Sequence, residues 1–240
     1  MKNRKTHFLL SLLALGIFGY LLWIQVNYKI SLDFNAKIPE GYNSLGIDVS
    51  HHQGKIDWDI LFDTTNVQPR INFVYVKATE GNNYLDRQWK YNRKTLLELG
   101  INHGAYHFFQ SKKLPAPQAE HFLKHWEPKE NDLPPVLDVE IEGFDDEDLR
   151  HKVKRWLAII EERSGMRPII YTSKSFYLTK FKGHFPNHKF WIASYSRNPK
   201  IQSDPAILHW QFTESATLPY HSTLVDLNVS KIKFRSSDGY

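Results

Sequence analysis

From residue 45 onward, eight short runs rich in β-branched and aromatic residues alternate with longer amphipathic runs, and this alternation limits the possible folds more than any other feature. It is typical of parallel strands joined by crossover helices, and eight strands in about 190 residues predict a compact, irregular TIM-like α/β barrel. Short loops between the last strands indicate that the closing edge departs from the regular pattern. We expect strands over 45–49, 72–77, 103–108, 135–140, 168–171, 190–194, 207–212 and 224–228, and fewer than eight helices, over 58–62, 85–99, 116–126, 146–162 and 174–180.

The net charge of +5 comes mostly from one end of the chain. Residues 1–30 contain four cations and no acid, which leaves 27 basic and 26 acidic residues after them. Nucleic-acid binding needs a basic face on the folded part, so nucleic acid is not a predicted partner. The absence of Cys excludes disulfides, thiolate metal ligands and a cysteine nucleophile. Glycine motifs for phosphate or dinucleotide binding are also missing, and we expect no cofactor and no metal.

An uncharged apolar run from Phe8 to Val26 follows three cations. As a helix it would extend about 28 Å, close to the roughly 30 Å hydrocarbon core of a bilayer. This predicts a membrane anchor with the barrel domain exported, and the alternative is a cleaved signal peptide and secretion. The expected organisation is a cytoplasmic basic tail over 1–7, a transmembrane helix over 8–28, a linker over 29–43, the barrel domain over 44–232 and a C-terminal tail over 233–240.

Nearly every expected strand ends in polar or charged residues. In a parallel barrel the C-terminal strand ends share one face, so these side chains should converge on a single cleft. Tyrosine and tryptophan rings pack well against the faces of sugars, and amides such as Gln211 and Asn228 can bond hydroxyl or acetamido groups. The candidate acids are Asp48, Asp138, Glu140 and Asp226, and the candidate substrate-binding residues are Tyr106, Tyr171, Trp191, Tyr195 and Gln211.

Asp138 and Glu140 interrupt the apolar segment LPPVLDVEIEG. Residues two apart on a strand face the same side, with Cα atoms about 6.6 Å apart. Repulsion and burial should keep a proton on one of the two carboxyl groups near neutral pH. A protonated acid beside an anion is the arrangement that acid-catalysed cleavage of glycosides requires. The alternative is a structural pair bonded to Lys77 or to backbone amides.

Histidine pairs raise the alternative of a metal-dependent polysaccharide deacetylase. His103 and His107 form H-x-x-x-H, and His51 and His52 follow Asp48. On a strand, however, residues four apart lie about 13 Å from each other, whereas on a helix they would share a face. We therefore predict no metal site from this spacing.

Eight segments together resemble the glycoside hydrolase family 25 lysozymes: GIDVSHHQG (46–54), FVYVKATEG (73–81), GAYHFF (104–109), PPVLDVE (134–140), PIIYTS (168–173), WIASY (191–195), HWQFT (209–213) and VDLNV (225–229). The resemblance implies a flattened eight-stranded barrel and an N-acetylmuramidase. Such an enzyme cuts the β-1,4 bond between N-acetylmuramic acid and N-acetylglucosamine of peptidoglycan, with retention. It also implies that Glu140 is the proton donor, Asp138 its partner, and Asp48 and Asp226 further acids of the cleft.

Several alternatives remain open at this point. The nucleophile is either the acetamido group of the substrate, which we favour, or a carboxylate. A barrel that binds glycan without cutting it is an alternative function, beside the deacetylase. We expect a monomer that is tethered to the membrane and acts on nearby peptidoglycan strands.

Overall fold

The computed structural model describes residues 2–63, 69–129, 132–196 and 203–234, without the side chains of residues 2–6 and 24–27. Most side chains of the predicted basic tail, and residues 235–240 of the predicted C-terminal tail, therefore lie outside the described residues.

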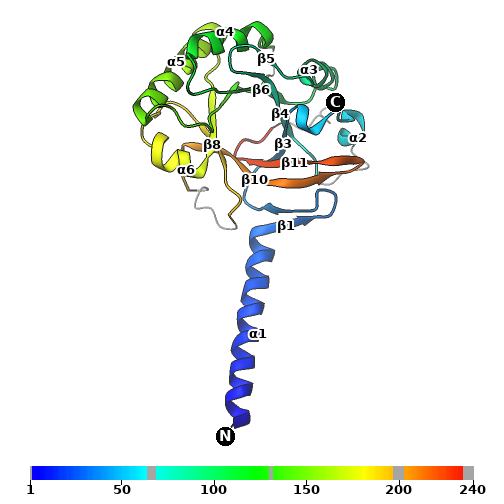
Figure 1. Cartoon of the computed structure of the whole chain (residues 1–240). Helices are drawn as coiled ribbons and strands as arrows, with labels where there is room; N and C mark the ends of the chain where they lie inside the picture. Colours follow the sequence, from blue (N-terminus) through cyan, green and yellow to red (C-terminus); the bar gives the residue numbers. More distant parts are fainter. Residues whose placement is uncertain (1, 64–68, 130–131, 197–202, 235–240) are drawn as a thin grey trace.

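Eight of the nine strands in the main sheet close into a barrel, in the order β3-β11-β10-β9-β8-β7-β6-β4 with β4 paired back to β3 (Figure 1). The ninth strand, β5 (Tyr84–Leu85), pairs only with the end of β4. The barrel strands are β3 (Ser44–Val49), β4 (Phe73–Glu80), β6 (His103–Phe108), β7 (Val136–Asp138), β8 (Ile169–Ser173), β9 (Phe190–Ala193), β10 (Ile207–Leu218) and β11 (His221–Ser230).

The barrel is mixed, so the expectation of parallel strands is wrong at its closing edge. Strand β11 runs antiparallel to both of its neighbours, β10 and β3, while the other six pairings are parallel. The cause is the connection between β10 and β11, which is a tight turn at Pro219 and Tyr220. A turn of this length permits only an antiparallel pair, since a parallel crossover needs a dozen or more residues.

Helices cover the outside of the barrel between the parallel strands (Figure 1). The longest of these covering helices, α5 (Asp146–Ser164), follows the cap Asp145, whose side chain accepts from the Asp148 N–H, and is closed by the cap Gly165, where φ is +71°. Its buried face repeats at helical spacing through Leu149, Val153, Trp156 and Ile160. The remaining helical segments are η1 (His51–Gln53), α2 (Trp58–Phe62), α3 (Trp89–Glu98), α4 (Pro115–His125), α6 (Lys174–Phe176) and the π-helical η2 (Tyr177–Phe181).

Aromatic side chains fill one end of the barrel interior. Phe73 and Tyr75 point inward from β4 and join Trp191 and Phe234 in a small internal cluster, whereas Val74 and Val76 between them face the helices. Gly46 lies against the Phe73 ring at a separation that no Cβ would permit. The plugged end leaves only the opposite end of the barrel open for a site.

Residues 28–39, which include most of the segment over 29–43 predicted as a linker, form a packed hairpin. Strand β1 (Tyr28–Ser31) pairs antiparallel with β2 (Ala36–Pro39). Phe34 in the turn is fully buried, and its carbonyl accepts from the Thr217 N–H of β10 at 3.0 Å. Burial of Phe34 and Ile38 explains why this polar segment folds onto the barrel.

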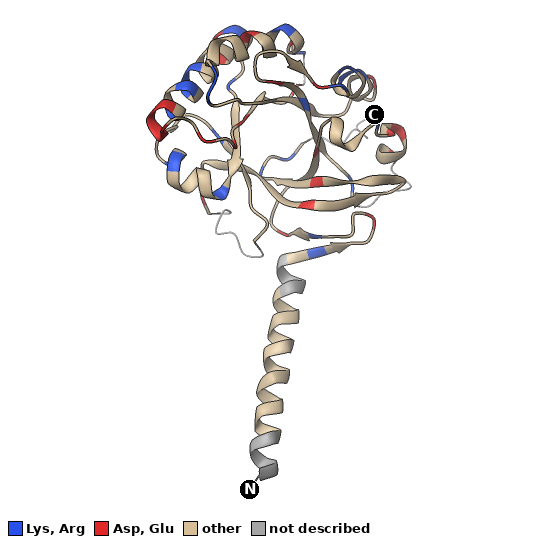
Figure 2. Cartoon of the chain, in the orientation of Figure 1, with Lys and Arg blue, Asp and Glu red and all other residues tan. Residues whose placement is uncertain are grey.

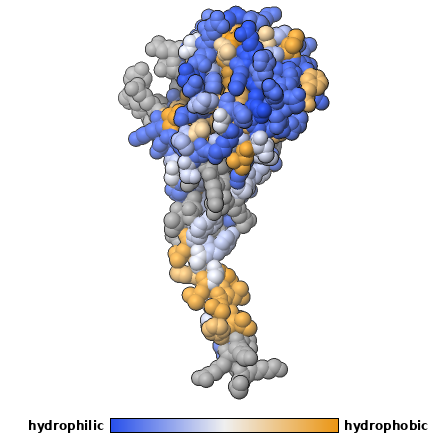
Figure 3. All heavy atoms as spheres, turned by 90° about the vertical axis from the view of Figure 1, so that its left-hand side faces the viewer, coloured by the Kyte–Doolittle hydropathy of each residue, from blue (hydrophilic) through white to orange (hydrophobic). Residues whose placement is uncertain are grey.

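The predicted transmembrane helix over 8–28 is also not upheld. Helix α1 (Lys2–Asn27) carries the exposed apolar surface that Figure 3 shows beside the largely hydrophilic barrel. Among the residues that the structure describes, however, no helix has both the length and the hydropathy needed to cross a bilayer.

Candidate active site

Carboxyl groups from three strands meet at the open end of the barrel. They line a cavity of about 80 Å³ whose walls come from β3, β6, β7, β8, β9 and β11. The lining residues are Asp48, Tyr106, Val136, Asp138, Glu140, Tyr171, Trp191 and Asp226.

Two different features of the fold bring the acids together. Asp48 and Asp138 lie at or near the C-terminal ends of β3 and β7, and Glu140 follows two residues later, as the parallel arrangement predicts. Asp226 instead lies within the antiparallel β11, and it reaches the cavity because its register partner on β3 is Asp48.

Asp48 and Asp226 titrate as a pair. Burial raises the pKa of Asp48 to about 6. The amides of Asn228 and Gln211 donate to this carboxyl group and lower its pKa, but burial has the larger effect. Burial, followed by the charges of Asp48 and Glu214, raises the pKa of Asp226 to about 9. At neutral pH, therefore, Asp226 keeps its proton and Asp48 is ionised.

Asp138 and Glu140 differ in their surroundings. Burial, followed by the neighbouring Glu140, raises the pKa of Asp138 well above its ordinary value, which favours the protonated form of this carboxyl group. Its Oδ1 atom is buried and has no hydrogen-bond partner among the described residues. Glu140 is exposed. Lys77 does not hold this pair in the manner of a structural ion pair, because its Nζ donates to Glu80 Oε2 at 2.8 Å.

Gln211 joins the acids to two tyrosines. Its Nε2 donates to Asp48 Oδ2 at 3.0 Å and to Asp226 Oδ2 at 3.1 Å, and its Oε1 accepts from the hydroxyls of Tyr171 at 2.8 Å and Tyr195 at 2.9 Å. These four bonds use both N–H groups and both lone pairs of the amide. Gln211 is 1% exposed, and its amide has no donor or acceptor left for the substrate contact that we expected. Its four bonds instead hold the acids and the tyrosines in position.

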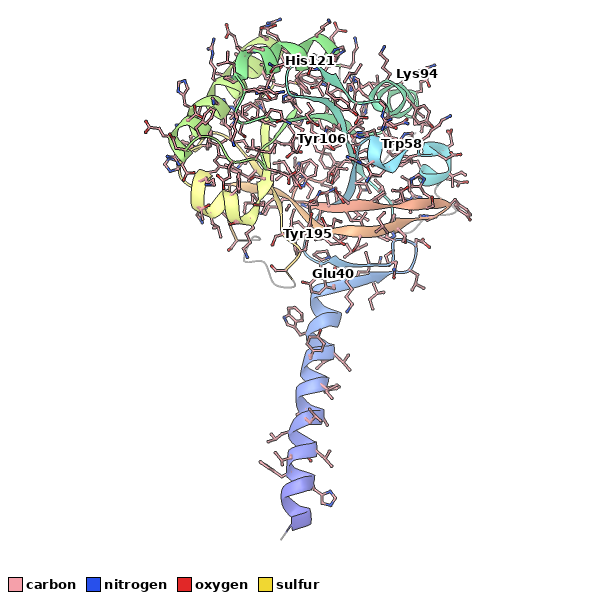
Figure 4. The ribbon with its side chains drawn as sticks, viewed as in Figure 1. Glu40, Trp58, Lys94, Tyr106, His121 and Tyr195 are labelled. Atoms are coloured by element: carbon pink, nitrogen blue, oxygen red, sulfur yellow. The ribbon has the colours of Figure 1, made fainter. Side chains whose placement is uncertain are left out.

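The predicted ring residues divide between two places. Tyr106, Tyr171 and Trp191 line the acidic cavity, and the Trp191 indole donates to Asn228 Oδ1 at 2.8 Å. Tyr195 lines a different cavity, and its hydroxyl donates to Gln211, which bonds Asp48 and Asp226. Figure 4 shows Tyr106 near the centre of the barrel and Tyr195 on the side from which α1 projects.

Glu214 is a fifth acid near the site that the sequence did not indicate. Figure 2 shows acidic positions close together on β10 and β11, whose only acids are Glu214 and Asp226. Side chains normally alternate between the two faces of a strand. The register of β10 against β11 shifts between Gln211 and Thr213, so counting this alternation from Gln211 gives the wrong face for Glu214.

The histidine pairs form no common site. His103 Nδ1 bonds the Ile101 carbonyl at 2.7 Å and its Nε2 meets Arg93 at 2.8 Å, while His107 Nδ1 lies 2.7 Å from Thr79 Oγ1. No group of three or more His, Asp or Glu in the described ranges is placed to hold a metal ion.

A closed barrel with interacting carboxyl groups at its open end defines a barrel glycoside hydrolase. The sequence profile named Glycosyl hydrolases family 25 matches residues 47–221, and the chain belongs to this family. It is 34% identical over 203 residues to the Escherichia coli protein YegX, covering 84% of this chain and 75% of that protein. It is 30% identical over 199 residues to Lysozyme M1 of Streptomyces globisporus, covering 76% of this chain and 66% of that protein.

The fold also matches a solved structure of a family 25 glycosyl hydrolase from Bacillus anthracis. The TM-score is 0.72 at 26% identity, and the match covers 85% of this chain and 92% of the other.

Proposed function

We propose that this protein is a muramidase that cleaves the β-1,4 bond between N-acetylmuramic acid and N-acetylglucosamine of peptidoglycan, with retention at the anomeric carbon. The observation that carries the proposal is the buried Asp138, whose Oδ1 has no partner among the described residues, two residues before the exposed Glu140 in the same cavity. Membership of Glycosyl hydrolases family 25 and the similarity to Lysozyme M1 support the bond and the substrate class.

Glu140 acts as the general acid. Its exposed carboxyl group can reach a glycosidic oxygen at the entrance of the cavity, whereas the buried Asp138 cannot. The proton of Asp138 passes to Glu140 and from there to the leaving oxygen as the bond breaks. In the second step the Glu140 carboxylate removes a proton from the attacking water.

Asp138 orients the acetamido group of the substrate. Once its proton has moved to Glu140, Asp138 is an anion with an unpartnered buried oxygen, which accepts from the acetamido N–H. The acetamido carbonyl oxygen then attacks the anomeric carbon, and the resulting positive charge lies beside the Asp138 carboxylate. This attack closes a ring between the acetamido group and the anomeric carbon. Water later opens that ring by attacking the anomeric carbon from the opposite face, which gives retention. Asp48, Asp226 and Gln211 fix the floor of the site and the position of Tyr171.

Peptidoglycan lies outside the cytoplasmic membrane, so the proposed substrate places the barrel domain on the exported side. The proposal is tested by digesting purified peptidoglycan with the wild-type protein, Glu140→Gln and a matched control, Glu142→Gln. Glu142 is exposed, pairs with Lys180 at 2.9 Å and does not line the cavity. Mass spectrometry should find N-acetylmuramic acid at the new reducing ends with the wild type and the control. The rate should fall by about 10²–10⁴-fold with Glu140→Gln.

Undiminished cleavage by Glu140→Gln would overturn the role of Glu140, and N-acetylglucosamine at the reducing ends would overturn the muramidase. Glycan binding without any cleavage would favour the non-catalytic barrel. Proton NMR of the first product separates the stereochemical outcomes, because retention releases the β-anomer before mutarotation.

A further inference from the structure

A second and larger cavity lies against the outer side of β10. Its volume is about 410 Å³, within the range of roughly 300–1,000 Å³ of small-molecule sites. The end of α1, the β1–β2 hairpin, the end of β9 and β10 each contribute to its walls. The residues that matter for its chemistry are Trp23, Tyr28, Lys37, Tyr195, Thr213 and Ser215.

The lining combines ring faces with hydroxyl groups and one cation. Trp23 and Tyr28 meet edge to face with ring centroids 5.7 Å apart, and Tyr195 supplies another ring from β9. Thr213 and Ser215, whose hydroxyls lie 3.1 Å apart, form a polar strip along β10, and exposed Lys37 adds a positive charge. Rings for the apolar faces of sugars, hydroxyls for their polar edges and a cation for a carboxylate suit an acidic amino-sugar polymer.

Tyr195 connects this cavity to the acidic one. Its ring is 48% exposed and lines the larger cavity, while its hydroxyl donates to Gln211 Oε1, which is itself bonded to Asp48 and Asp226 through Nε2. Two hydrogen-bonded side chains, Tyr195 and Gln211, therefore link the larger cavity to the acids of the smaller one. This short link places both cavities within reach of one glycan strand.

We propose that the larger cavity binds a stretch of the peptidoglycan glycan strand next to the stretch that is cut. The inference rests on the proposed muramidase function and extends it to a second binding site. Trp23, Tyr28 and Lys37 precede residues 47–221, which match the family profile, so this wall belongs to the N-terminal segment of this chain. In strands freed of their stem peptides, the lactyl carboxylate of N-acetylmuramic acid is the anion that Lys37 would meet.

The test compares long, peptide-free glycan strands with a tetrasaccharide of the same repeat. Binding is measured by calorimetry in the full-length Glu140→Gln background, so that nothing is cut. The cavity variant is Trp23→Ala/Tyr28→Ala, and the matched control is Tyr220→Ala, which removes an 81% exposed ring that lines neither cavity. We expect the affinity for long strands to fall about tenfold in the cavity variant, or about 1.4 kcal/mol, with tetrasaccharide affinity unchanged.

A second variant, Ser215→Trp, fills the cavity from an exposed strand position and should cause the same selective loss. Equal long-strand affinities in the control and in both cavity variants would overturn the proposal, as would an equal loss for strands and tetrasaccharide. If the wild type cuts peptidoglycan and the cavity variants bind normally, only this inference fails. If the selective loss is seen but the wild type cuts nothing, the muramidase fails and the second site stands.

Discussion

Asp226 lies directly across from Asp48 in the antiparallel register of β11 and β3, and the two carboxyl groups hold one proton between them at neutral pH. Two ionised carboxylates at adjacent strand positions would repel each other strongly in a buried site. The protonated Asp226 and the amide of Gln211 relieve that repulsion. The pair therefore favours a proton on Asp226 and a negative charge on Asp48 at neutral pH.

The substitution Asp226→Asn should flatten the dependence of stability on pH. The folded pKa of Asp226 is about 9 and the ordinary value is 3.8, so between these values the folded state binds a proton that the unfolded state releases. The stabilisation is complete at low pH and is lost as the pH rises through 9. Thermal unfolding from pH 5 to pH 9 should show a smaller decline in Tm for Asp226→Asn than for the wild type. The exposed control Asp59→Asn should keep the wild-type slope, and equal slopes in all three proteins would contradict the prediction.

Replacing Asp138 by Asn should remove activity without loss of stability. The raised pKa of Asp138 favours its protonated form in the folded protein, and the neutral amide has nearly the same shape and charge as that form. It cannot become the anion that the transition state needs, and kcat should fall by about 10²–10³-fold. Reducing-sugar assays together with urea unfolding at pH 7 test both statements. A variant that unfolds at lower urea than Glu142→Gln would show that Asp138 is ionised in the resting protein.

Gln211→Met tests the orienting role of the amide. Methionine fills a similar volume but leaves Asp48, Asp226 and two tyrosine hydroxyls without this partner. Each buried group that loses its partner costs about 1–3 kcal/mol, so urea unfolding should show a loss of at least about 2 kcal/mol. Gln88→Met is the control, since the Gln88 side chain makes no capping bond at α3. A loss no larger than that of the control would mean that water replaces the amide.

Gly46→Ala tests how the plugged end of the barrel is packed. A Cβ at Gly46 would overlap the buried Phe73 ring, whose neighbours Tyr75, His209 and Phe234 leave it little room to move. Overpacking of this kind costs about 1–3 kcal/mol, and calorimetric unfolding should show a lower Tm. Gly19→Ala, where nothing lies within 4 Å, should leave the Tm of the barrel unchanged. An unchanged Tm for Gly46→Ala would show that the ring shifts freely.

The strands and helices of the barrel were predictable because their periodicities are local properties of the sequence. The helix predicted over 58–62 matches α2, and the strand predicted over 103–108 matches β6. The direction of β11 was not predicted, since it depends on the turn at Pro219 and Tyr220 and on pairing with β3, far away in the sequence. The hairpin at residues 28–39 was missed because its stability comes from Phe34, which packs against β10, and not from its own composition.

The site was predictable to the level of which acids meet, but not of how they are held. Polar residues at strand ends pointed to Asp48 and Asp138, and the parallel part of the barrel accounts for both. The role of Gln211 depends on four partners in four other segments of the chain, and no local sequence pattern reveals such partners. Tyr195 was assigned to the acidic cavity because it ends a strand, whereas its ring turns to the outer face.

The position of β11 has a consequence for the timing of activity. Asn228, which bonds Asp48 across 180 residues of sequence, belongs to the last strand of the chain. Until that strand has left the ribosome and inserted between β3 and β10, the barrel is open and Asp48 lacks both the amide of Asn228 and the carboxyl of Asp226. A chain that lacks β11 therefore lacks both Asp226 and Asn228 and cannot assemble the acidic site at the open end of the barrel.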